Sequence, residues 1–224
     1  MFIMGAFAHL GIFATLIVAL LLGFNLAEST AIGMIGAIDG PTVIYVNGKL
    51  GDLFVTPGLA AAIAVTAYSY MSLVPIIQPP LMRLFTTKKE RGIRMEYTPR
   101  PVSRATVIIF PILITIIAAI FLPEAAPLIA TLMLGNLLKE SDVVPGLVET
   151  SKNAITNTAT IFLGITIGST MQAAHFLNWG TLRVLILGLV AFALNTIGGL
   201  LFGRLVCAIS GRKINPLVGA AAIS

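Results

Sequence analysis

The sequence is poor in charge and has almost no cysteine. Only 10% of its 224 residues are charged and 57% are hydrophobic, whereas about a quarter of the residues in soluble domains are charged. A soluble globular domain is therefore excluded, and lipid is the expected solvent. The single cysteine, Cys207, excludes an internal disulfide and a cysteine-based metal cluster. The sequence also contains no phosphate loop, dinucleotide fingerprint, zinc motif or nucleophile triad.

The few cations are concentrated in one stretch. Seven cations and two carboxylates lie between Arg83 and Arg104, and their balance equals the net charge of the whole chain, +5. A basic cluster between apolar runs is typical of a cytoplasmic loop rather than of a nucleic-acid surface. We therefore predict that residues 81–105 form a basic cytoplasmic loop that helps to hold a partner subunit or anionic lipid, and we expect no nucleic-acid partner.

Long apolar runs predict a multi-pass protein of the cell (inner) membrane. A spanning helix needs about 20 apolar residues, and a cleaved signal peptide is not indicated at the N-terminus. We expect spans at residues 1–24, 59–77, 106–122 and 181–207, a weaker span at 153–176, and a short apolar piece at 127–138 that crosses only partly. The lipid bilayer is therefore the first partner that the sequence predicts.

Two further apolar segments, residues 31–46 and 214–224, contain helix-breaking residues. The first has Asp39, Gly40 and Pro41 in the middle of a membrane-grade run, and the second begins with Asn215 and Pro216. Proline removes a backbone donor and glycine tolerates unusual dihedrals, so both segments should open and free main-chain carbonyls. Such backbone persists at membrane depth only where protein or a watery cavity surrounds it.

The arrangement of these segments predicts inverted repeats. Residues 1–80 form a first repeat that contains the broken segment 31–46, and residues 106–224 form a second that contains the truncated broken segment 214–224. If the basic loop at 81–105 and the basic turn at residues 204–213 are both cytoplasmic, the two broken segments enter from opposite sides, which is the plan of ion-coupled transporters. The predicted fold is a polytopic all-α membrane bundle with re-entrant helices, in a single transmembrane domain. Because no helix returns after the second broken segment, we expect a fragment of a longer chain.

Asp39 is the only carboxylate inside a long uncharged run, since the nearest charged residues are Glu28 and Lys49. An ionised carboxylate in hydrocarbon is costly, so it must be paired, protonated or bound to a cation. Sodium, as a hard cation, takes oxygen ligands, and the hydroxyl of Thr42 with freed carbonyls would complete a suitable set. The alternative is that Asp39 and the residues after it form an ordinary turn at the membrane interface.

Other polar residues in apolar surroundings complete the candidate site. In the second broken segment, Asn215, Gly219 and Ser224 could form a matching sodium wall, although Asn-Pro after a basic turn is also typical of a helix start. Tyr68 and Tyr70 lie near the middle of a predicted span, where a phenol could donate a proton or simply belong to an aromatic belt. Gln78, just before two prolines, could line a path or end the helix.

Five ordered motifs carry a family resemblance that covers nearly the whole chain. They are Gly36-Ala-Ile-Asp39-Gly-Pro-Thr42, Ala67-Tyr-Ser-Tyr-Met71, Pro75-Ile-Ile-Gln-Pro-Pro80, Thr86-Thr-Lys-Lys-Glu-Arg91 and Ile214-Asn-Pro-Leu-Val-Gly219-Ala220. With them the sequence resembles the beta subunits of sodium-pumping oxaloacetate, methylmalonyl-CoA and glutaconyl-CoA decarboxylases. The family usually has Gly-Gly-Ala before the aspartate, where this chain has Gly36, Ala37 and Ile38.

The resemblance implies a mechanism. A carboxyltransferase subunit loads carboxybiotin in the cytoplasm, and the beta subunit decarboxylates it with uptake of a proton and exports sodium. Asp39 then matches the sodium-binding and proton-exchanging carboxylate, Tyr70 or Tyr68 the proton donor, and Asn215, Gly219 and Ser224 the second sodium wall. The implied partners are a carboxyltransferase and biotin-carrier subunit and a small membrane subunit, and a homo-oligomer is left open.

Two other functions fit the same residues. A secondary sodium/carboxylate symporter also combines inverted broken segments with a lone membrane carboxylate. A packing subunit without chemistry of its own is the third reading, which the membrane-embedded Asp39 disfavours. A biotinylated partner in the purified complex would favour the decarboxylase.

Overall fold

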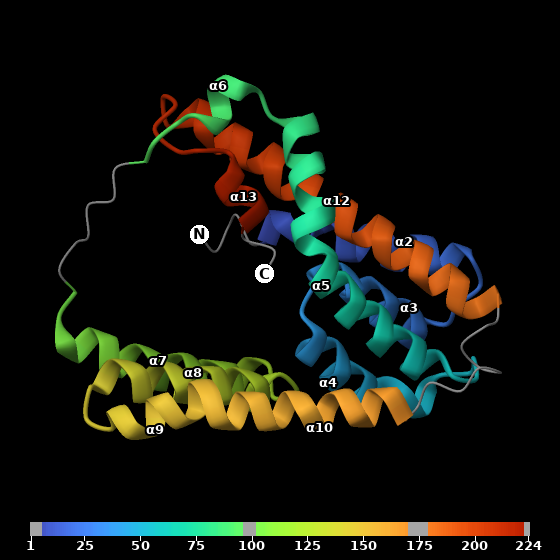
Figure 1. Ribbon diagram of the computed structural model, residues 1–224, viewed down its shortest axis with the longest axis horizontal. Coiled ribbons are helices and arrows are strands. Elements are labelled where there is room, and N and C mark those ends of the chain that lie inside the picture. The colour runs from blue at the N-terminus through green and yellow to red at the C-terminus, as the bar shows by residue number, and fades with distance from the viewer. Residues whose placement is uncertain (1–5, 96–101, 170–178, 222–224) are drawn as a thin grey trace. The chain divides into compact units, whose positions relative to one another are not determined.

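The computed structural model describes residues 6–95, 102–169 and 179–221, and within these ranges the chain is helical with no strand (Figure 1). Three helices are long and apolar enough to cross a membrane: α5 (Leu59–Phe85), α7 (Arg104–Phe121) and α12 (Trp179–Ile209). A shorter apolar helix covers Ala6–Leu21 and includes α2 (Leu10–Leu21). The predicted all-helical membrane fold is therefore confirmed.

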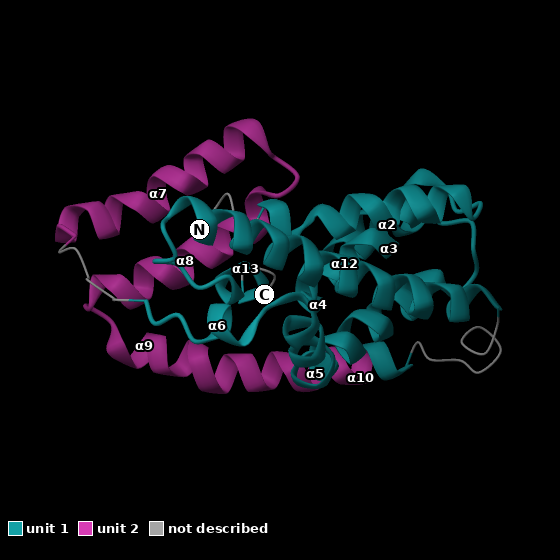
Figure 2. Cartoon of the chain, turned by 90° about the horizontal axis from the view of Figure 1, so that it is seen from above, with its two compact units in different colours: residues 1–96, 167–224 teal, residues 97–166 magenta. Residues whose placement is uncertain are grey.

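The chain divides into two compact units, which Figure 2 shows in different colours. Unit 1 comprises residues 1–96 and 167–224, and unit 2 comprises residues 97–166. Unit 1 combines helices from both predicted repeats, whereas unit 2 comes from the second alone. The repeat itself stays a prediction, because the unit boundaries follow packing and not sequence symmetry.

Unit 2 begins with a helical hairpin. Helix α7 is followed by α8 (Ala126–Ser141), and the guanidinium of Arg104 donates a hydrogen bond of 3.0 Å to the carbonyl oxygen of Ser141 at the far end of the pair. Next come α9 (Pro145–Thr150), a π-helical turn at Ser151–Ile155 and α10 (Thr156–Ser169). Most apolar side chains of this unit are exposed, as expected for helices that face lipid.

Unit 1 contains the hydrophobic core. Helix α12 packs against α5 and α2 and is the longest helix described in the unit. α3 (Leu26–Met34), the 3₁₀ turn η1 (Ile35–Ala37) and the short helix α13 (Leu217–Ala221) also pack against it. The unit further contains α4 (Gly40–Leu50), which packs against α5 and α3, the 3₁₀ turn η2 (Gly51–Leu53) and the short helix α6 (Lys88–Arg91). The buried aliphatic residues of the core come from α2, α3, η1, α4, α5 and α12, and include Ala19, Ile32, Ile35, Val43, Leu59, Ile63, Val184 and Leu187.

The helix predicted at residues 59–77 is longer than expected. It runs on to Phe85 through Pro75, Pro79 and Pro80, so residues 81–85, which we expected in the basic loop, belong to α5. An internal proline costs about 3 kcal/mol in an exposed helix, but neighbouring helices and side chains supply substitute contacts in a membrane bundle. The prolines were therefore misread as the end of the span.

The remaining boundaries differ less from the prediction. The span expected at residues 181–207 is observed as α12, two residues longer at each end, and the short piece at 127–138 lies within α8. The weaker span at 153–176 is helical as far as Ser169, and its last residues lie outside the described ranges. Helix ends commonly differ by this much between a pattern and a structure.

Candidate functional site

The first broken segment opens just before Asp39. Helix α3 ends at Met34, the turn η1 follows, and Ile38 then adopts the left-handed conformation with φ 58°. Asp39 is extended and is the N-cap of α4, whose first turn contains Pro41. Proline suits this position because the first helical N–H groups have no intrahelical acceptor to lose. Gly40 and Pro41 therefore start a helix. The break in regular helix lies just before them, at Ile38 and Asp39.

Ile38 holds its unusual conformation because its side chain is buried. A β-branched residue in the left-handed region costs roughly 1–2 kcal/mol, whereas burying an isoleucine side chain contributes about 1.5–3 kcal/mol. Ile38 packs in a small cluster with Ala8 and Phe192, so its burial offsets the backbone strain. The same contact fixes the direction in which the chain leaves the break towards Asp39.

Both carboxylate oxygens of Asp39 accept hydrogen bonds from Thr42. The backbone N–H of Thr42 lies 3.2 Å from one oxygen, and the Thr42 hydroxyl donates to the other. Asp39 is exposed, and no cationic side chain among the described residues forms an ion pair with it. A carboxylate has about four acceptor positions, so two remain for a cation. The hydroxyl oxygen of Thr42 also keeps lone pairs, because its proton points to Asp39.

The structure separates the roles of the two candidate tyrosines. The ring of Tyr68 lies directly over Gly40, where an added Cβ would come within 2.6 Å of a Tyr68 ring carbon. Gly40 follows Asp39 in the chain, so Tyr68 lies beside the break. Tyr70 instead points to α12 and donates a 2.5 Å hydrogen bond to the carbonyl oxygen of Leu185. Of the two phenols, Tyr68 is therefore the one next to Asp39.

The second broken segment begins with a capped helix start. The side-chain oxygen of Asn215 accepts a 3.0 Å hydrogen bond from the backbone N–H of Leu217, and its amide nitrogen donates to the carbonyl oxygens of Arg91 at 3.2 Å and Ile93 at 2.9 Å. Both polar atoms of this side chain are therefore engaged in holding the backbone. Ser224, the last predicted member of the site, lies outside the described residues.

Helix α13 packs backbone to backbone against α12. A Cβ on Gly219 would lie 1.8 Å from the carbonyl oxygen of Gly199, and a Cβ on Gly203 would lie 2.3 Å from that of Pro216. No residue but glycine fits at such a contact. The carbonyl oxygen of Ala220 also accepts a 3.1 Å hydrogen bond from Gln78 of α5. Gln78 therefore does not end a helix but joins α5 to the second broken segment.

Helix α12 holds both broken segments at neighbouring positions. The amide nitrogen of Asn195 donates a 2.6 Å hydrogen bond to the carbonyl oxygen of Gly36 in the first segment, and Gly199 contacts Gly219 in the second. Four residues along a helix correspond to about 6 Å. The two breaks, far apart in the sequence, therefore meet the same helix within about one turn of each other.

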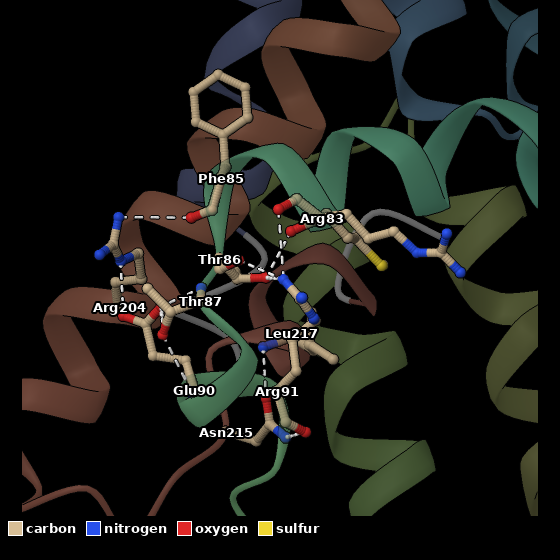
Figure 3. A network of polar contacts seen from close by, with 10 residues as sticks. Arg83, Phe85, Thr86, Thr87, Glu90, Arg91, Arg204, Asn215 and Leu217 are labelled. Carbon is tan, nitrogen blue, oxygen red and sulfur yellow. Dashed lines mark hydrogen bonds and ion pairs between the residues drawn. The ribbon is translucent and has the colours of Figure 1, made fainter.

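A polar network joins the two basic stretches at one end of unit 1 (Figure 3). The guanidinium of Arg204 lies 2.9 Å from a carboxylate oxygen of Glu90 and 3.4 Å from the carbonyl oxygen of Phe85. Arg91 donates to the carbonyl oxygens of Thr86 and Arg83. The ends of α5 and α12 therefore lie on the same side of the unit, as expected if both stretches are cytoplasmic.

Glu90 is held as an anion in this network. The backbone N–H of Thr87 lies 2.7 Å from its carboxylate, and this bond, which outweighs partial burial, holds the pKa of Glu90 below the ordinary glutamate value. The Thr87 hydroxyl and Arg204 lower this pKa further. Thr87 and Glu90 form a capping box at the start of α6, in which each side chain bonds to the backbone of the other.

A basic pocket of about 610 Å³ opens beside the network. Its charged lining is Lys89, Glu90, Arg204 and Arg212, and its apolar part includes Cys207 and Ala208 near the end of α12. Three cations face one carboxylate here, so the pocket favours an anionic group. Cys207 is buried in the wall of this pocket, which agrees with a packing role.

Sequence reasoning missed two buried polar residues that hold backbone groups of unit 1. One is Asn195, which lies in an apolar run and looked like an ordinary residue of a span. The other is Glu28, which is buried and accepts hydrogen bonds from the backbone N–H groups of Asn25 at 3.0 Å, Val55 at 3.0 Å and Thr56 at 2.7 Å. A sequence signal existed for each, since Asn195 is polar within a membrane span and Glu28 lies three residues after Asn25, the spacing of a capping box.

Comparison with known proteins places this geometry in one family. Residues 1–224 match the family model described as Na+-transporting oxaloacetate decarboxylase beta subunit. The chain is 52% identical over 222 residues to the methylmalonyl-CoA decarboxylase subunit beta of Veillonella parvula and 49% identical over 222 residues to the glutaconyl-CoA decarboxylase subunit beta of Acidaminococcus fermentans. It is 47% identical over 228 residues to the oxaloacetate decarboxylase beta chain 2 of Salmonella typhi.

These matches cover 99% of this chain but 58%, 58% and 51% of the three relatives, so the chain spans between half and three-fifths of their length. Both broken segments and α5, which contains Tyr68 and Tyr70, lie inside the matched region. The family resemblance inferred from five short motifs is thereby confirmed. The chain belongs to the family of the membrane-bound beta subunits of sodium-transporting decarboxylases.

Proposed function

We propose that this chain provides the sodium-binding core of the membrane subunit of a sodium-pumping, biotin-dependent decarboxylase, in which decarboxylation of carboxybiotin drives sodium export. The observation that supports it most is that two broken segments meet on one helix, and that one of these segments contains a carboxylate without an ion-pair partner among the described residues. Freed backbone oxygens beside a lone carboxylate are the ligands that a hard cation takes.

The sodium ion is the cargo, and Asp39 is its charged ligand. Thr42 orients the carboxylate from two directions and adds its own hydroxyl oxygen. We assign the second wall to Gly219, Ser224 and Asn215. Because the polar atoms of Asn215 bond to the backbone, its part is to shape the wall, while backbone oxygens of the segment face the ion.

Tyr68 is the group that we propose as proton donor. Decarboxylation of carboxybiotin releases carbon dioxide and consumes one proton, which replaces the carboxyl group on the biotin nitrogen. The phenol of Tyr68 is held beside Asp39 by its contact with Gly40. When Tyr68 gives its proton to biotin, the tyrosinate left beside Asp39 favours uptake of a replacement proton from solvent at Asp39. Protonated Asp39 loses its attraction for sodium, which releases the ion.

The cytoplasmic partners meet the basic end of unit 1 in this proposal. A carboxyltransferase and biotin-carrier subunit delivers carboxybiotin, and a small membrane subunit completes the complex. The pocket lined by Lys89, Arg204 and Arg212 offers an anion-binding surface on the side of the basic loop. We propose it as the docking point for an acidic surface of the carrier-bearing partner.

The test is Asp39→Asn in the full-length complex. Asparagine caps a helix as well as aspartate does, so assembly and melting temperature should stay near those of the wild type. Sodium-stimulated decarboxylation should fall by at least about a hundredfold, because a cation ligand that carries charge contributes several kcal/mol in a site of low dielectric constant.

Thr30→Val is a matched control for Asp39→Asn, since Thr30 is a hydroxyl residue of α3 whose side chain bonds, among the described residues, only to Leu26 of its own helix. Near-normal sodium-stimulated turnover in an assembled Asn variant would refute the assignment of Asp39. A purified complex without a biotinylated subunit would instead favour the symporter.

A further inference from the structure

Asn195 is a polar residue in the middle of a membrane-spanning helix, and it is fully buried. Its amide nitrogen donates a 2.6 Å hydrogen bond to the carbonyl oxygen of Gly36, 159 residues away in the chain. Gly36 belongs to the turn η1 at the break, two residues before the left-handed Ile38 and three before Asp39. The bond therefore fixes backbone at the point where regular helical pairing stops.

The backbone of two neighbouring segments approaches the Asn195 side chain closely, at Gly36 and Gly11. A Cβ on Gly36 would lie 2.9 Å from the amide nitrogen of Asn195 and 2.7 Å from Cβ of Ala191. A Cβ on Gly11 of α2 would lie 2.4 Å from the side-chain oxygen of Asn195. Glycines on two other segments thus let the backbone approach Asn195 closely, which small residues allow in membrane bundles.

The second polar atom of Asn195 is left without a bond. Its side-chain oxygen is buried and has no hydrogen-bond partner among the described residues. Burying an unpaired polar atom is unfavourable, so asparagine is a costly side chain at this position unless its amide nitrogen has a role. The amide nitrogen is the part of Asn195 that has a function in the structure, and its acceptor is the Gly36 carbonyl.

The neighbouring residue shows what an ordinary buried polar side chain does in this helix. Thr196 is also fully buried, and its hydroxyl donates a 3.0 Å hydrogen bond to the carbonyl oxygen of Phe192, four residues earlier in α12. That bond stays within one helix and holds no other segment. Asn195 and Thr196 therefore share depth, burial and helix but differ in whether they reach the break.

We propose that Asn195 is a positioning residue for the sodium site, which fixes the open turn at Gly36 and so sets the direction in which Asp39 faces the ion. This inference rests on the proposed function. Without the Asn195 bond, the turn loses its side-chain hydrogen bond to α12, the only one between them among the described residues. Asp39 is then presented in several orientations, and sodium binds less tightly even though every ligand is still present.

The experiment compares Asn195→Leu with Thr196→Val in the full-length complex. The sodium concentration for half-maximal decarboxylation should rise at least about tenfold in Asn195→Leu, whereas the rate at saturating sodium changes by less than about threefold. Thr196→Val should change both values by less than about twofold. A purely structural role would lower the amount of assembled complex without shifting the sodium requirement of the assembled fraction.

A second variant and a second measurement keep the inference testable. Asn195→Ala removes the bond without adding volume and is used if the leucine variant does not assemble. Sodium-dependent protection against heating, measured without decarboxylation substrate, reports the same shift independently of turnover. An unchanged sodium requirement in an assembled Asn195 variant refutes the inference. Normal turnover in Asp39→Asn refutes the proposed function instead, so the two failures are distinguishable.

Discussion

The two broken segments differ in what each leaves unsatisfied. The first contains Asp39, whose charge has no ion-pair partner among the described residues and whose direction depends on contacts from Thr42, Ile38 and Gly36. The second begins at Asn215, whose polar atoms all bond to backbone groups. The carboxylate in the first segment therefore keeps free acceptor positions for a cation, whereas the polar side chain in the second is fully hydrogen-bonded and holds the backbone in place.

This difference suggests a division of labour between the segments. A carboxylate with free acceptor positions supplies most of the attraction for an ion, while a capped helix start supplies fixed backbone oxygens and shape. Both segments are attached to α12, but the first is tied by a side-chain hydrogen bond and the second by direct backbone contact through Gly199 and Gly219. Each attachment can be broken separately, which makes the comparison testable.

The largest loss of activity and stability is expected when a substitution disrupts the contact between the second broken segment and α12. In Gly219→Ala the new methyl group would lie 1.8 Å from the carbonyl oxygen of Gly199, and backbone on the facing helix cannot rotate away as a side chain could. Overpacking of this kind costs about 1–3 kcal/mol or more. We expect loss of sodium-dependent activity and a lower melting temperature of the complex in detergent.

Gly164→Ala is the matched control for this substitution. Gly164 also lies in a helix, but no described atom comes within 4 Å of a Cβ placed on it, and alanine is the better helix former by about 1 kcal/mol. We therefore expect unchanged or slightly higher stability. Equal tolerance of both substitutions would show that the contact between α13 and α12 does not hold the second wall in place.

The next largest effect tests which tyrosine of α5 is the proton donor beside the first broken segment. Tyr68→Phe keeps the ring on Gly40 but removes the hydroxyl, and loss of a general acid typically lowers rates about 10²–10⁴-fold. Tyr70→Phe removes a hydrogen bond to the carbonyl oxygen of Leu185, which costs about 1–3 kcal/mol of stability. The first should therefore reduce turnover and the second mainly the melting temperature.

Turnover at saturating sodium and thermal stability, measured on both tyrosine variants in the same preparation, decide this comparison. If Tyr70→Phe loses turnover while Tyr68→Phe keeps it, the proton donor has been assigned to the wrong residue. The sequence could not make this distinction, because it does not show which side of the helix faces Asp39. Their different directions come from the helix, where residues two apart face different sides.

Much of the fold could be predicted from the sequence because apolar length and charge clusters report directly on the membrane. The spans at α7 and α12 and the break before α4 were predicted in this way. The end of α5 was not, because the cost of Pro75, Pro79 and Pro80 depends on neighbouring segments that a single-sequence pattern does not show. Tertiary contacts decide such cases.

The candidate site could be predicted only where the sequence near a residue identifies it. Asp39 was found in this way, because it is a charged residue within a long uncharged run. The role of Asn195 depends on a contact with Gly36, which no local pattern reveals. Asn215 was expected to face the ion, whereas its side chain binds the backbone of its own segment and of the basic loop. The helix-start alternative therefore describes the geometry of Asn215 better.

The smallest effect concerns the ion pair that joins the basic loop to the end of α12. Glu90→Gln keeps the capping box, because glutamine also serves at this position, but removes the charge that faces Arg204. The pair is partly exposed, and such pairs contribute about 0–1 kcal/mol. We expect the melting temperature at neutral pH to fall by a few degrees at most, with little change in activity.

The pH dependence of this small difference identifies its cause. The pKa of Glu90 is lower in the folded protein than the ordinary glutamate value, so its charge stabilises the fold above that ordinary value and this contribution is lost as the pH falls through the folded pKa. The gap between wild type and Glu90→Gln should therefore close from about pH 5 downwards. Glu140→Gln is the control, since Glu140 pairs only with its exposed neighbour Lys139 among the described residues. A gap that stays constant with pH would mean that hydrogen bonding, and not charge, joins Glu90 to Arg204.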